Sequence, residues 1–233
     1  MKKCVIPISG GLDSTVILHS ARQKYEIYAV SFDYGQRHLD AEMICAISQA
    51  GLVAKEHKIL DLGFFKQIIT TSSLTNDDIS VAKTKDVLGD PQTVNYVPNR
   101  NMMMLSICTA YAESVGADTV FHGAALVDSQ AGYWDGSVEF LEAINNINKL
   151  NRRDQVTIKA PLISKSKKEI IELGFELNVD FSSTWTCYEG RKQACGECPA
   201  CSSRIKGFMD AGLIDPLTYE QDIPWDQFHC KVI

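Results

Sequence analysis

The residues best suited to chemistry lie near the start of the chain, in the run Ser9-Gly10-Gly11-Leu12-Asp13-Ser14-Thr15. Two adjacent glycines let a backbone approach an anion closely and adopt dihedral angles that other residues avoid. The hydroxyl groups, together with the free N–H groups that open a helix, can surround negatively charged oxygens. The run therefore predicts a loop that binds the phosphates of a nucleotide, in which Asp13 either orders the loop or holds a magnesium ion.

The spacing of this nucleotide loop excludes two other phosphate-binding motifs. The chain has no Gly-x-x-x-x-Gly-Lys-[Ser/Thr] motif, which marks enzymes that transfer phosphoryl groups. It also lacks a Gly-x-Gly-x-x-Gly motif after a predicted strand, so we expect no dinucleotide site. Ser-Gly-Gly-x-Asp-Ser instead resembles the pyrophosphate loop of the N-type ATP pyrophosphatases. That resemblance implies that ATP is cleaved between its α and β phosphates and that AMP is left on an oxygen of the substrate.

A second group of residues that could support chemistry is the cysteine cluster Cys187-x7-Cys195-x2-Cys198-x2-Cys201. In a cytosolic chain, clustered cysteines bind a metal more often than they form disulfides. Four thiolates without an open coordination position suit a structural Zn²⁺ ion, and Gly196 between two of them suits a tight metal-binding turn. Because Cys-x2-Cys-x2-Cys also occurs in ferredoxin-like proteins, an iron–sulfur cluster is the competing interpretation.

A parallel sheet must position the nucleotide loop. Apolar runs predict buried strands at 3–9, 27–32, 53–59 and 119–123. Periodicity predicts helices at 14–23, 39–51, 102–115, 137–150, 165–177 and 202–211. In the helix over 39–51 the expected buried stripe includes Ala41, Met43, Ile44, Ile47 and Leu52. Residues 70–97 and 124–136 lack clear periodicity and predict loops.

The alternation of strands and helices over the first sixty residues predicts an α/β fold, a Rossmann-like parallel sheet with helices on both faces. In such a sheet, ligands bind at the carboxyl ends of the strands, which is where the nucleotide loop begins. The length suits one α/β domain with a small appendage. We therefore expect an ATP-pyrophosphatase domain over 1–180 and a zinc-binding C-terminal segment over 181–233 that packs on it.

Composition narrows the classes of substrate. The formal net charge of the 233 residues is −6, and no extended block of Lys or Arg stands out. Proteins that grip long nucleic acids usually present a basic face, so a small-molecule substrate is favoured. No apolar run reaches the ~18 residues of a membrane span, and residues 1–9 lack the apolar core of a signal peptide. We expect a cytoplasmic protein in which Cys4, Cys45 and Cys108 are buried small apolar side chains.

Three further motifs follow the nucleotide loop in order. They are Ser31-Phe32-Asp33-Tyr34-Gly35-Gln36-Arg37-His38, Val97-Pro98-Asn99-Arg100-Asn101 and Thr186-Cys187-Tyr188-Glu189-Gly190. Together, and along nearly the whole chain, they resemble the 7-cyano-7-deazaguanine synthase family of queuosine biosynthesis. The resemblance implies a fold of the adenine nucleotide alpha hydrolase type and an ATP-dependent ligase. Such an enzyme adenylates 7-carboxy-7-deazaguanine, lets ammonia displace AMP, and uses a second ATP to turn the resulting amide into the nitrile.

The resemblance also implies roles for individual residues. The expected catalytic residues are Asp13, Asp33, Arg100 and Lys165, of which the two cations are candidates for stabilising phosphate charge. The expected ATP contacts are Ser9, Gly10, Gly11, Leu12, Asp13, Ser14 and Thr15. The expected substrate contacts are Phe32, Tyr34, Gln36, Arg37, His38, Asn101, Asp128, Tyr133 and Asp135. The expected cofactors are Zn²⁺ at Cys187, Cys195, Cys198 and Cys201 and Mg²⁺ with ATP, and the expected assembly is a homodimer.

The chain departs from the family pattern where the substrate should bind. The family's usual Gly-Tyr-Pro-Asp-Cys reads Gly132-Tyr133-Trp134-Asp135-Gly136 here, and Asn99 stands where glycine or alanine is common. A wider loop with Gly136 would suit a larger nucleophile, so one alternative is a relative that conjugates the deazapurine to a protein amine in antiviral defence. Another is a different class, either a nucleotide-binding regulatory module or an RNA thiolase. The complete nucleotide loop disfavours an inactive module, and the acidic charge disfavours the RNA enzyme.

Overall fold

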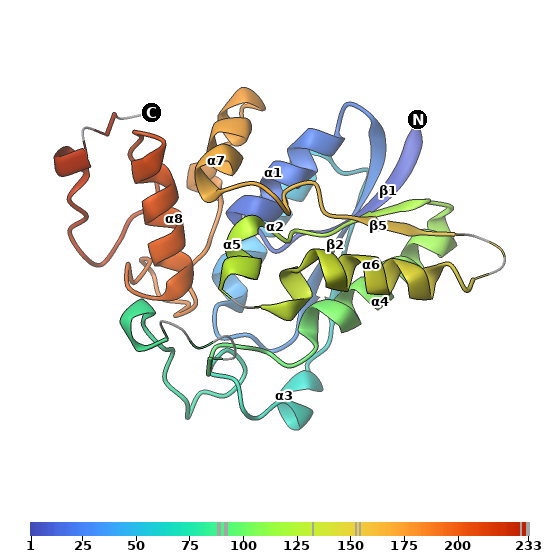
Figure 1. The fold of residues 1–233 in the computed structure, drawn as a ribbon, viewed down its shortest axis with the longest axis horizontal. Helices are drawn as coiled ribbons and strands as arrows, with labels where there is room; N and C mark the ends of the chain where they lie inside the picture. Colours follow the sequence, from blue (N-terminus) through green and yellow to red (C-terminus); the bar gives the residue numbers. More distant parts are fainter. Residues whose placement is uncertain are drawn as a thin grey trace.

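The fold is described by a computed structural model, which places residues 1–87, 90, 93–131, 133–151, 153, 155–228 and 230–231. Within these residues the centre is a five-stranded parallel sheet in the order β3-β2-β1-β4-β5 (Figure 1). The strands are β1 (Lys2–Pro7), β2 (Tyr25–Asp33), β3 (Glu56–Asp61), β4 (Thr119–Phe121) and β5 (Thr157–Lys159). The predicted α/β class and parallel sheet are confirmed, and β5 is an addition that the sequence pattern did not indicate. The prediction on Gly132 lies outside the described residues.

Helices cover both faces of the sheet, as predicted. One face carries α4 (Arg100–Val115) and α6 (Val138–Asn148), and the other carries α1 (Leu12–Ala21), α2 (Leu39–Val53) and α7 (Lys167–Glu176) (Figure 1). The last helix, α8 (Pro199–Asp210), packs beside α7 at the edge of the molecule. Shorter described elements are α3 (Phe65–Ile68), α5 (Leu126–Gln130) and the 3-10 turns η1 (Thr84–Asp86), η2 (Trp134–Gly136), η3 (Phe181–Ser183) and η4 (Trp225–Phe228).

The central strands are apolar on both sides because each face of the sheet meets helices. Successive residues of a strand point in opposite directions. In β1, Cys4 and Ile6 belong to the cluster shared with α1 and α7, whereas Val5 belongs to the cluster shared with α4. Continuous apolar strands are typical of such doubly covered parallel sheets. Cys4 and Cys108 are fully buried as predicted, while Cys45 is only partly buried.

The predicted buried stripe of the second helix is wrong. The exposed side chains of α2 include Ile44, Ile47 and Leu52, which are 70%, 49% and 68% exposed. The buried ones are Ala46, Gln49 and Ala50. Small side chains are needed on this face because the nucleotide loop lies directly against it, and a Cβ on Gly10 would come within 2.7 Å of the Ala46 nitrogen.

Two predicted boundaries also move. The second helix continues to Val53, so β3 begins at Glu56 and not at residue 53. The segment 124–136 is not all loop, because it contains α5 and η2. Asp128 accepts a hydrogen bond from the Ala125 nitrogen at 2.8 Å and so helps to start α5. None of the described helices is long and apolar enough to cross a membrane.

The C-terminal segment shares its core with the sheet. Trp185 belongs to the hydrophobic cluster that contains Val5, and Phe208 of α8 belongs to the other cluster. Arg204, only 1% exposed, pairs with both carboxylate oxygens of the buried Asp215 at 2.6 and 2.9 Å. Removing one partner of such a pair leaves a buried charge and costs about 3–5 kcal/mol. The segment therefore packs firmly on the α/β sheet, and the domain limits 1–180 and 181–233 stay a prediction.

Candidate functional site

The nucleotide loop joins β1 to α1 at the carboxyl edge of the sheet. Gly10 has a φ of +76°, a conformation that favours glycine, and its carbonyl accepts a hydrogen bond from the Trp185 nitrogen at 2.9 Å. Ser9 Oγ accepts a hydrogen bond from the Gly11 nitrogen at 3.2 Å and lies 3.2 Å from Ser14 Oγ. The first N–H groups of α1 have no intrahelical partners and no side-chain cap. The loop and the helix start therefore present several donors to an anion.

A cavity of about 380 Å³ opens beside this loop, at the ends of β1, β2 and β4. Its volume lies within the roughly 300–1,000 Å³ that is typical of small-molecule sites. The strand order runs outwards from β1 to β2 on one side and to β4 on the other, and α/β sheets bind ligands at such switch points. From the loop, Ser9, Gly11, Leu12, Asp13 and Ser14 line the cavity, whereas Gly10 and Thr15 are not among its lining residues.

Most of the predicted substrate contacts line the same cavity. They are Phe32, Tyr34, Gln36, His38, Asn101, Asp128, Tyr133 and Asp135, and Arg100 joins them. Arg100 Nη1 donates to the Tyr34 hydroxyl at 3.0 Å, and its guanidinium lies over the Tyr34 ring, 5.7 Å from the centroid. Burial raises the pKa of Tyr34 above its ordinary value, so the hydroxyl stays protonated beside this cation. An aromatic wall with a fixed cation suits a flat polar ligand that carries negative charge.

Asn99, the residue that departs from the expected motif, has an unusual backbone conformation. Asn99 is the N-cap of α4 and has a φ of +55°, in the left-handed region. Asparagine tolerates this region better than most side chains. The helix that carries Arg100 and Asn101 therefore still begins at the cavity wall.

Two other predicted site residues lie outside the cavity wall and make structural contacts. Asp33 Oδ1 accepts a hydrogen bond from the Gly35 nitrogen at 2.9 Å, which shapes the turn after β2. Arg37 Nη2 donates to the carbonyls of Asn76 and Ile79 at 3.2 and 2.9 Å. Arg37 therefore holds the segment 70–97, called the long loop from here on, against the end of β2.

The lysine beside the nucleotide loop is not the one that the sequence indicated. Lys165 precedes Ser166, the N-cap of α7, and lies outside the cavity wall. Lys167, in the first turn of α7, lines the cavity. Its Nζ lies 2.7 Å from both carboxylate oxygens of Asp13. The cap at Ser166 places one lysine outside the helix and directs the other towards the loop.

Tyr133 was among the predicted substrate contacts, but the residues that join it in the cavity wall, Asn95 and Tyr96, were not predicted. Asn95 and Tyr96 line the cavity from the end of the long loop. Tyr96 and Tyr133 stack with ring centroids 6.3 Å apart, and Trp134 Nε1 donates to the Tyr96 hydroxyl at 2.7 Å. The two loops are therefore joined across the cavity by aromatic side chains. The only signal in the sequence was the unusual tryptophan within the family motif.

Two ionisable side chains in the cavity have shifted pKa values. Burial raises the pKa of Asp128 to about 6. Burial lowers the pKa of His122, whose Nε2–H donates to the Asp135 carbonyl at 3.0 Å. The histidine is therefore neutral at neutral pH, and the aspartate exchanges its proton at mildly acidic pH. Groups perturbed by burial inside a cavity are frequent at functional sites.

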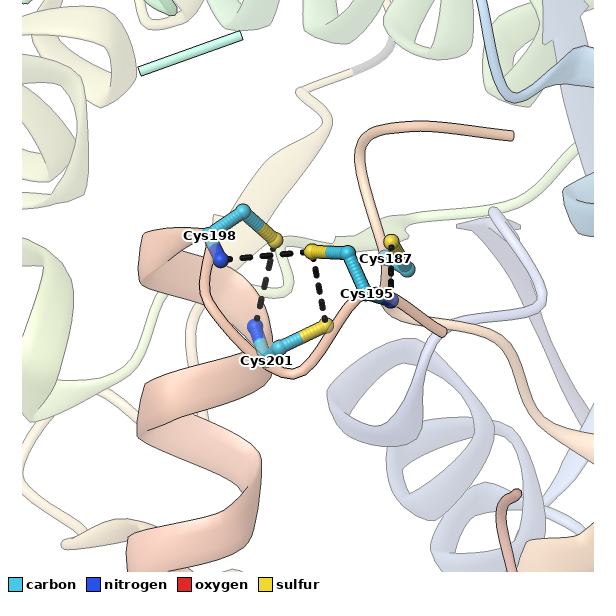
Figure 2. Close-up of side chains that lie close together, drawn as sticks. All are labelled: Cys187, Cys195, Cys198 and Cys201. Atoms are coloured by element: carbon cyan, nitrogen blue, oxygen red, sulfur yellow. Dashed lines mark hydrogen bonds between the residues drawn. The ribbon is translucent and has the colours of Figure 1, made fainter. Parts of the chain in front are cut away.

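The four clustered cysteines converge on one point (Figure 2). Their sulfur atoms all lie within 4.8 Å of one another, and Sγ of Cys195 and Sγ of Cys201 are 3.9 Å apart. Tetrahedral zinc with Zn–S bonds of about 2.3 Å requires sulfurs ~3.8 Å apart. The nitrogens of Cys195, Cys198 and Cys201 each donate to the sulfur of the preceding cysteine in the cluster, at 3.2, 3.3 and 3.5 Å. Such donors stabilise thiolates, so the cluster can bind a metal ion.

The segment that carries the clustered cysteines also supports the cavity wall. Thr84 Oγ1 donates to the Glu197 carbonyl at 3.0 Å and lies 2.6 Å from Ser202 Oγ. Lys83 forms an ion pair with the Glu197 carboxylate. Pro199, at the start of α8, lines the cavity itself. The stacked pair Tyr96 and Tyr133 is called the tyrosine wall from here on. The long loop, which supplies Tyr96, is thus tied to the segment that holds the cysteines.

Comparison with known proteins identifies close relatives over nearly the whole chain. Residues 3–212 match the family model described as Queuosine biosynthesis protein QueC. The chain is 40% identical to 7-cyano-7-deazaguanine synthase 1 of Colwellia psychrerythraea, over 94% of this chain and 99% of that protein. It is also 40% identical to the 7-cyano-7-deazaguanine synthase of Thermoplasma volcanium, over 99% of this chain and 95% of the relative. The NMN synthetase from Francisella tularensis shares the fold, with a TM-score of 0.52 at 16% identity over 98% of this chain and 84% of the other.

Proposed function

The chain belongs to the family of queuosine biosynthesis proteins described as QueC, and from that premise we propose that it is a 7-cyano-7-deazaguanine synthase. As an ATP-dependent ligase, it would convert 7-carboxy-7-deazaguanine and ammonia to the nitrile through an adenylated intermediate, with release of AMP and pyrophosphate. The observation that supports this most directly is that a single cavity joins the nucleotide loop to a wall of tyrosines. Ammonia is favoured over a protein amine as the acceptor because the relatives bear the name of the synthase.

In the first half of the reaction, the task of the chain is to hold ATP and align its α-phosphate. The N–H groups from Leu12 to Ser14 would bind the outer phosphates, and the helix start adds partial positive charge. Lys167 supplies a full charge that Asp13 holds in place at 2.7 Å. Because both Asp13 oxygens contact Lys167, we assign this aspartate to ordering the lysine and not to magnesium. Mg²⁺ bound with ATP would neutralise further charge on the pyrophosphate.

The deazaguanine ring fits the tyrosine side of the cavity. The Asn101 amide offers a donor and an acceptor to a purine edge. Arg100, held against Tyr34, is placed to stabilise negative charge that develops on the α-phosphate. Gln36 shapes the wall, because its amide accepts from the Tyr34 nitrogen and donates to the Phe32 carbonyl. The substrate carboxylate would then point towards the nucleotide loop.

The metal that we propose for the cysteine cluster is a structural Zn²⁺ ion. The cluster offers four buried sulfur ligands, and hydrogen bonds from the neighbouring Cys187, Cys198 and Cys201 thiols hold the pKa of Cys195 below its ordinary value. Four protein ligands leave no open position for a substrate. Zinc would therefore tie the segment together and take no part in the chemistry.

Two further parts of the proposal concern the whole protein. The family resemblance favours a homodimer, which sedimentation of the purified protein would test. A cytoplasmic location agrees with the eight free thiols, because the cytoplasm keeps thiols reduced.

The function is tested by incubating the protein with ATP, magnesium, 7-carboxy-7-deazaguanine and ammonium and measuring products by mass spectrometry. We expect the nitrile, with AMP and pyrophosphate released in equal amounts. Ser14→Ala should lower pyrophosphate release about 100-fold or more, because a donor at the phosphate site is lost. Ser114→Ala, on the exposed side of α4, is the matched control. Release of ADP, or AMP release with a mass increment on a protein and no nitrile, would contradict the proposal.

A further inference from the structure

Asp128 lies where the nucleotide loop and the tyrosine wall meet. Its carboxylate is close enough to Asp13, Lys167 and Asp135 for their charges to act on it. It lines the cavity, and its Oδ2 accepts a hydrogen bond from the Ala125 nitrogen at 2.8 Å. Within the part of the chain that the structure describes, no hydrogen bond reaches Oδ1. This oxygen is therefore available to a ligand at the junction of the two subsites.

Gly136 allows the Asp128 side chain to occupy this place. A Cβ on Gly136 would lie 2.5 Å from the Asp128 Cβ. Any larger residue at position 136 would therefore displace the carboxylate. The two residues come from neighbouring elements, α5 and η2, so backbone packing fixes the position of the acid.

The proposed reaction needs a base at this junction. Between a primary amide and a nitrile, two N–H protons leave the nitrogen and the C–O bond breaks. Adenylation makes the oxygen a good leaving group, but it leaves one N–H proton to be removed. Of the neighbouring ionisable groups, Asp13 is engaged at both oxygens by Lys167, and His122 Nε2 is engaged by the Asp135 carbonyl. Asp128 keeps a free oxygen at this junction, and the packing of Gly136 against its Cβ holds that oxygen in place.

We propose that Asp128 is the general base of the nitrile-forming step and that Gly136 positions it. The inference rests on the proposed function. When the amide oxygen is adenylated, the nitrogen loses its first proton to solvent and the neutral imidate R–C(=NH)–O–AMP forms. In the nitrile-forming step the Asp128 carboxylate takes the remaining N–H proton of the imidate, and the electron pair of that bond enters the new C≡N bond. The C–O bond breaks and AMP leaves with its electron pair. The proton then passes from Asp128 to solvent.

The surroundings of Asp128 suit a base that works near neutral pH. Burial raises its pKa to about 6, Asp13 and Asp135 add to the rise, and a backbone N–H and Lys167 oppose it. Tyr188 also faces this carboxylate, and burial raises the pKa of Tyr188 so far that it stays neutral. A base is most effective when its pKa is near the working pH. Because only the ionised carboxylate accepts a proton, nitrile formation slows as the pH falls through about 6.

The test uses the amide intermediate, 7-amido-7-deazaguanine, with ATP and magnesium. Asp128→Asn keeps the shape and the bond to the Ala125 nitrogen but cannot take the proton. We expect kcat for nitrile formation to fall about 100- to 10,000-fold with little change in KM, and the acid limb to vanish from the profile of kcat/KM against pH. Gly136→Ala should lower kcat in the same direction. Asp118→Asn, a matched change at the opposite end of β4, should keep the wild-type rate.

Melting temperature shows that the variant is folded. At neutral pH the charged, half-buried carboxylate opposes folding, so Asp128→Asn should melt at or above the wild-type temperature, and the gain should disappear in acid. An acid limb that persists in Asp128→Asn, or a raised KM with unchanged kcat, would overturn the inference and leave the proposed function standing. A wild-type protein that forms no nitrile from the amide would overturn both.

Discussion

Folding brings the positively charged side chain of Lys167 next to the nucleotide loop. Its ammonium group contacts both Asp13 oxygens at 2.7 Å, and its stem packs against Gly207 of α8, where a Cβ would overlap it. The lysine side chain is 13% exposed, so solvent and salt screen this pair less than a pair on the open surface. One residue thus joins α1, α7 and α8 beside the nucleotide loop.

Replacing Lys167 with methionine should lower the rate of pyrophosphate release about 100-fold, because a fixed cation is lost from the transition state. Methionine keeps the stem that packs on α8. The matched control is Lys168→Met, which removes an exposed cation from the same helix. Lys165→Met should also retain most of the activity. If Lys165→Met were as damaging as Lys167→Met, the role assigned to the first turn of α7 would be wrong.

At the scale of residues, the sequence predicts motifs whose members are neighbours in the chain, and it misses contacts between residues that only folding brings together. The nucleotide loop and the cysteines are recognisable because their members follow one another at fixed spacing. Lys167 and Asp13 are 154 positions apart in the chain, so no motif with a fixed spacing predicts their contact. Arg37 belongs to a specific motif, yet in the structure it binds the carbonyls of the long loop.

At the scale of elements, the long loop is ordered by side-chain hydrogen bonds. Asn95 Oδ1 accepts from Ser73 Oγ at 2.7 Å and from the Ala82 nitrogen at 3.0 Å, which closes the loop on itself. Thr84 then joins the loop, through hydrogen bonds, to the segment that carries the clustered cysteines. The tyrosine wall at the end of the loop therefore depends on contacts made outside the cavity.

Thr84→Val removes the hydroxyl group and keeps the shape of the side chain. A lost hydrogen bond worth about 0.5–1.5 kcal/mol should raise the KM for the deazaguanine roughly 2- to 10-fold and leave the KM for ATP unchanged. Steady-state kinetics with each substrate varied in turn measures both values. Thr70→Val, an exposed change in the same segment, is the control. Equal increases in the two KM values would show that the contact supports the whole site and not its substrate wall.

The type of most main elements was predictable, but the buried face of the second helix and the strand β5 were not. Periodicity predicted a helix over 39–51, but the stripe chosen from apolar residues leaves Ile44 and Leu52 largely exposed. The true inner face consists of small residues because Gly10 approaches the helix closely. In β5 only Ile158 of the three residues is buried, so the strand is too short and too mixed to show a pattern.

At the scale of the whole molecule, the cysteine cluster lies in the C-terminal segment next to the cavity, which Pro199, the neighbour of Cys198, lines. Purified protein should contain about one zinc ion per chain and be colourless. Chelation should lower the melting temperature and weaken binding of the deazaguanine, because α8 and the long loop both depend on this segment. Metal analysis, thermal melting and binding assays check these outcomes. A visible absorption band with bound iron and sulfide would instead support the iron–sulfur interpretation.

Trp185 connects the nucleotide loop to the cysteine cluster through one short stretch of backbone. Its nitrogen donates to the Gly10 carbonyl at 2.9 Å, and its indole N–H donates to the Cys187 carbonyl at 2.8 Å. Inserting or deleting a single residue between Trp185 and Cys187 would shift one site against the other. Length variation among relatives should therefore be absent from this stretch and accumulate in surface loops. A homologue with a gap at this place can be recognised, from its alignment alone, as one that has lost nucleotide binding or its metal.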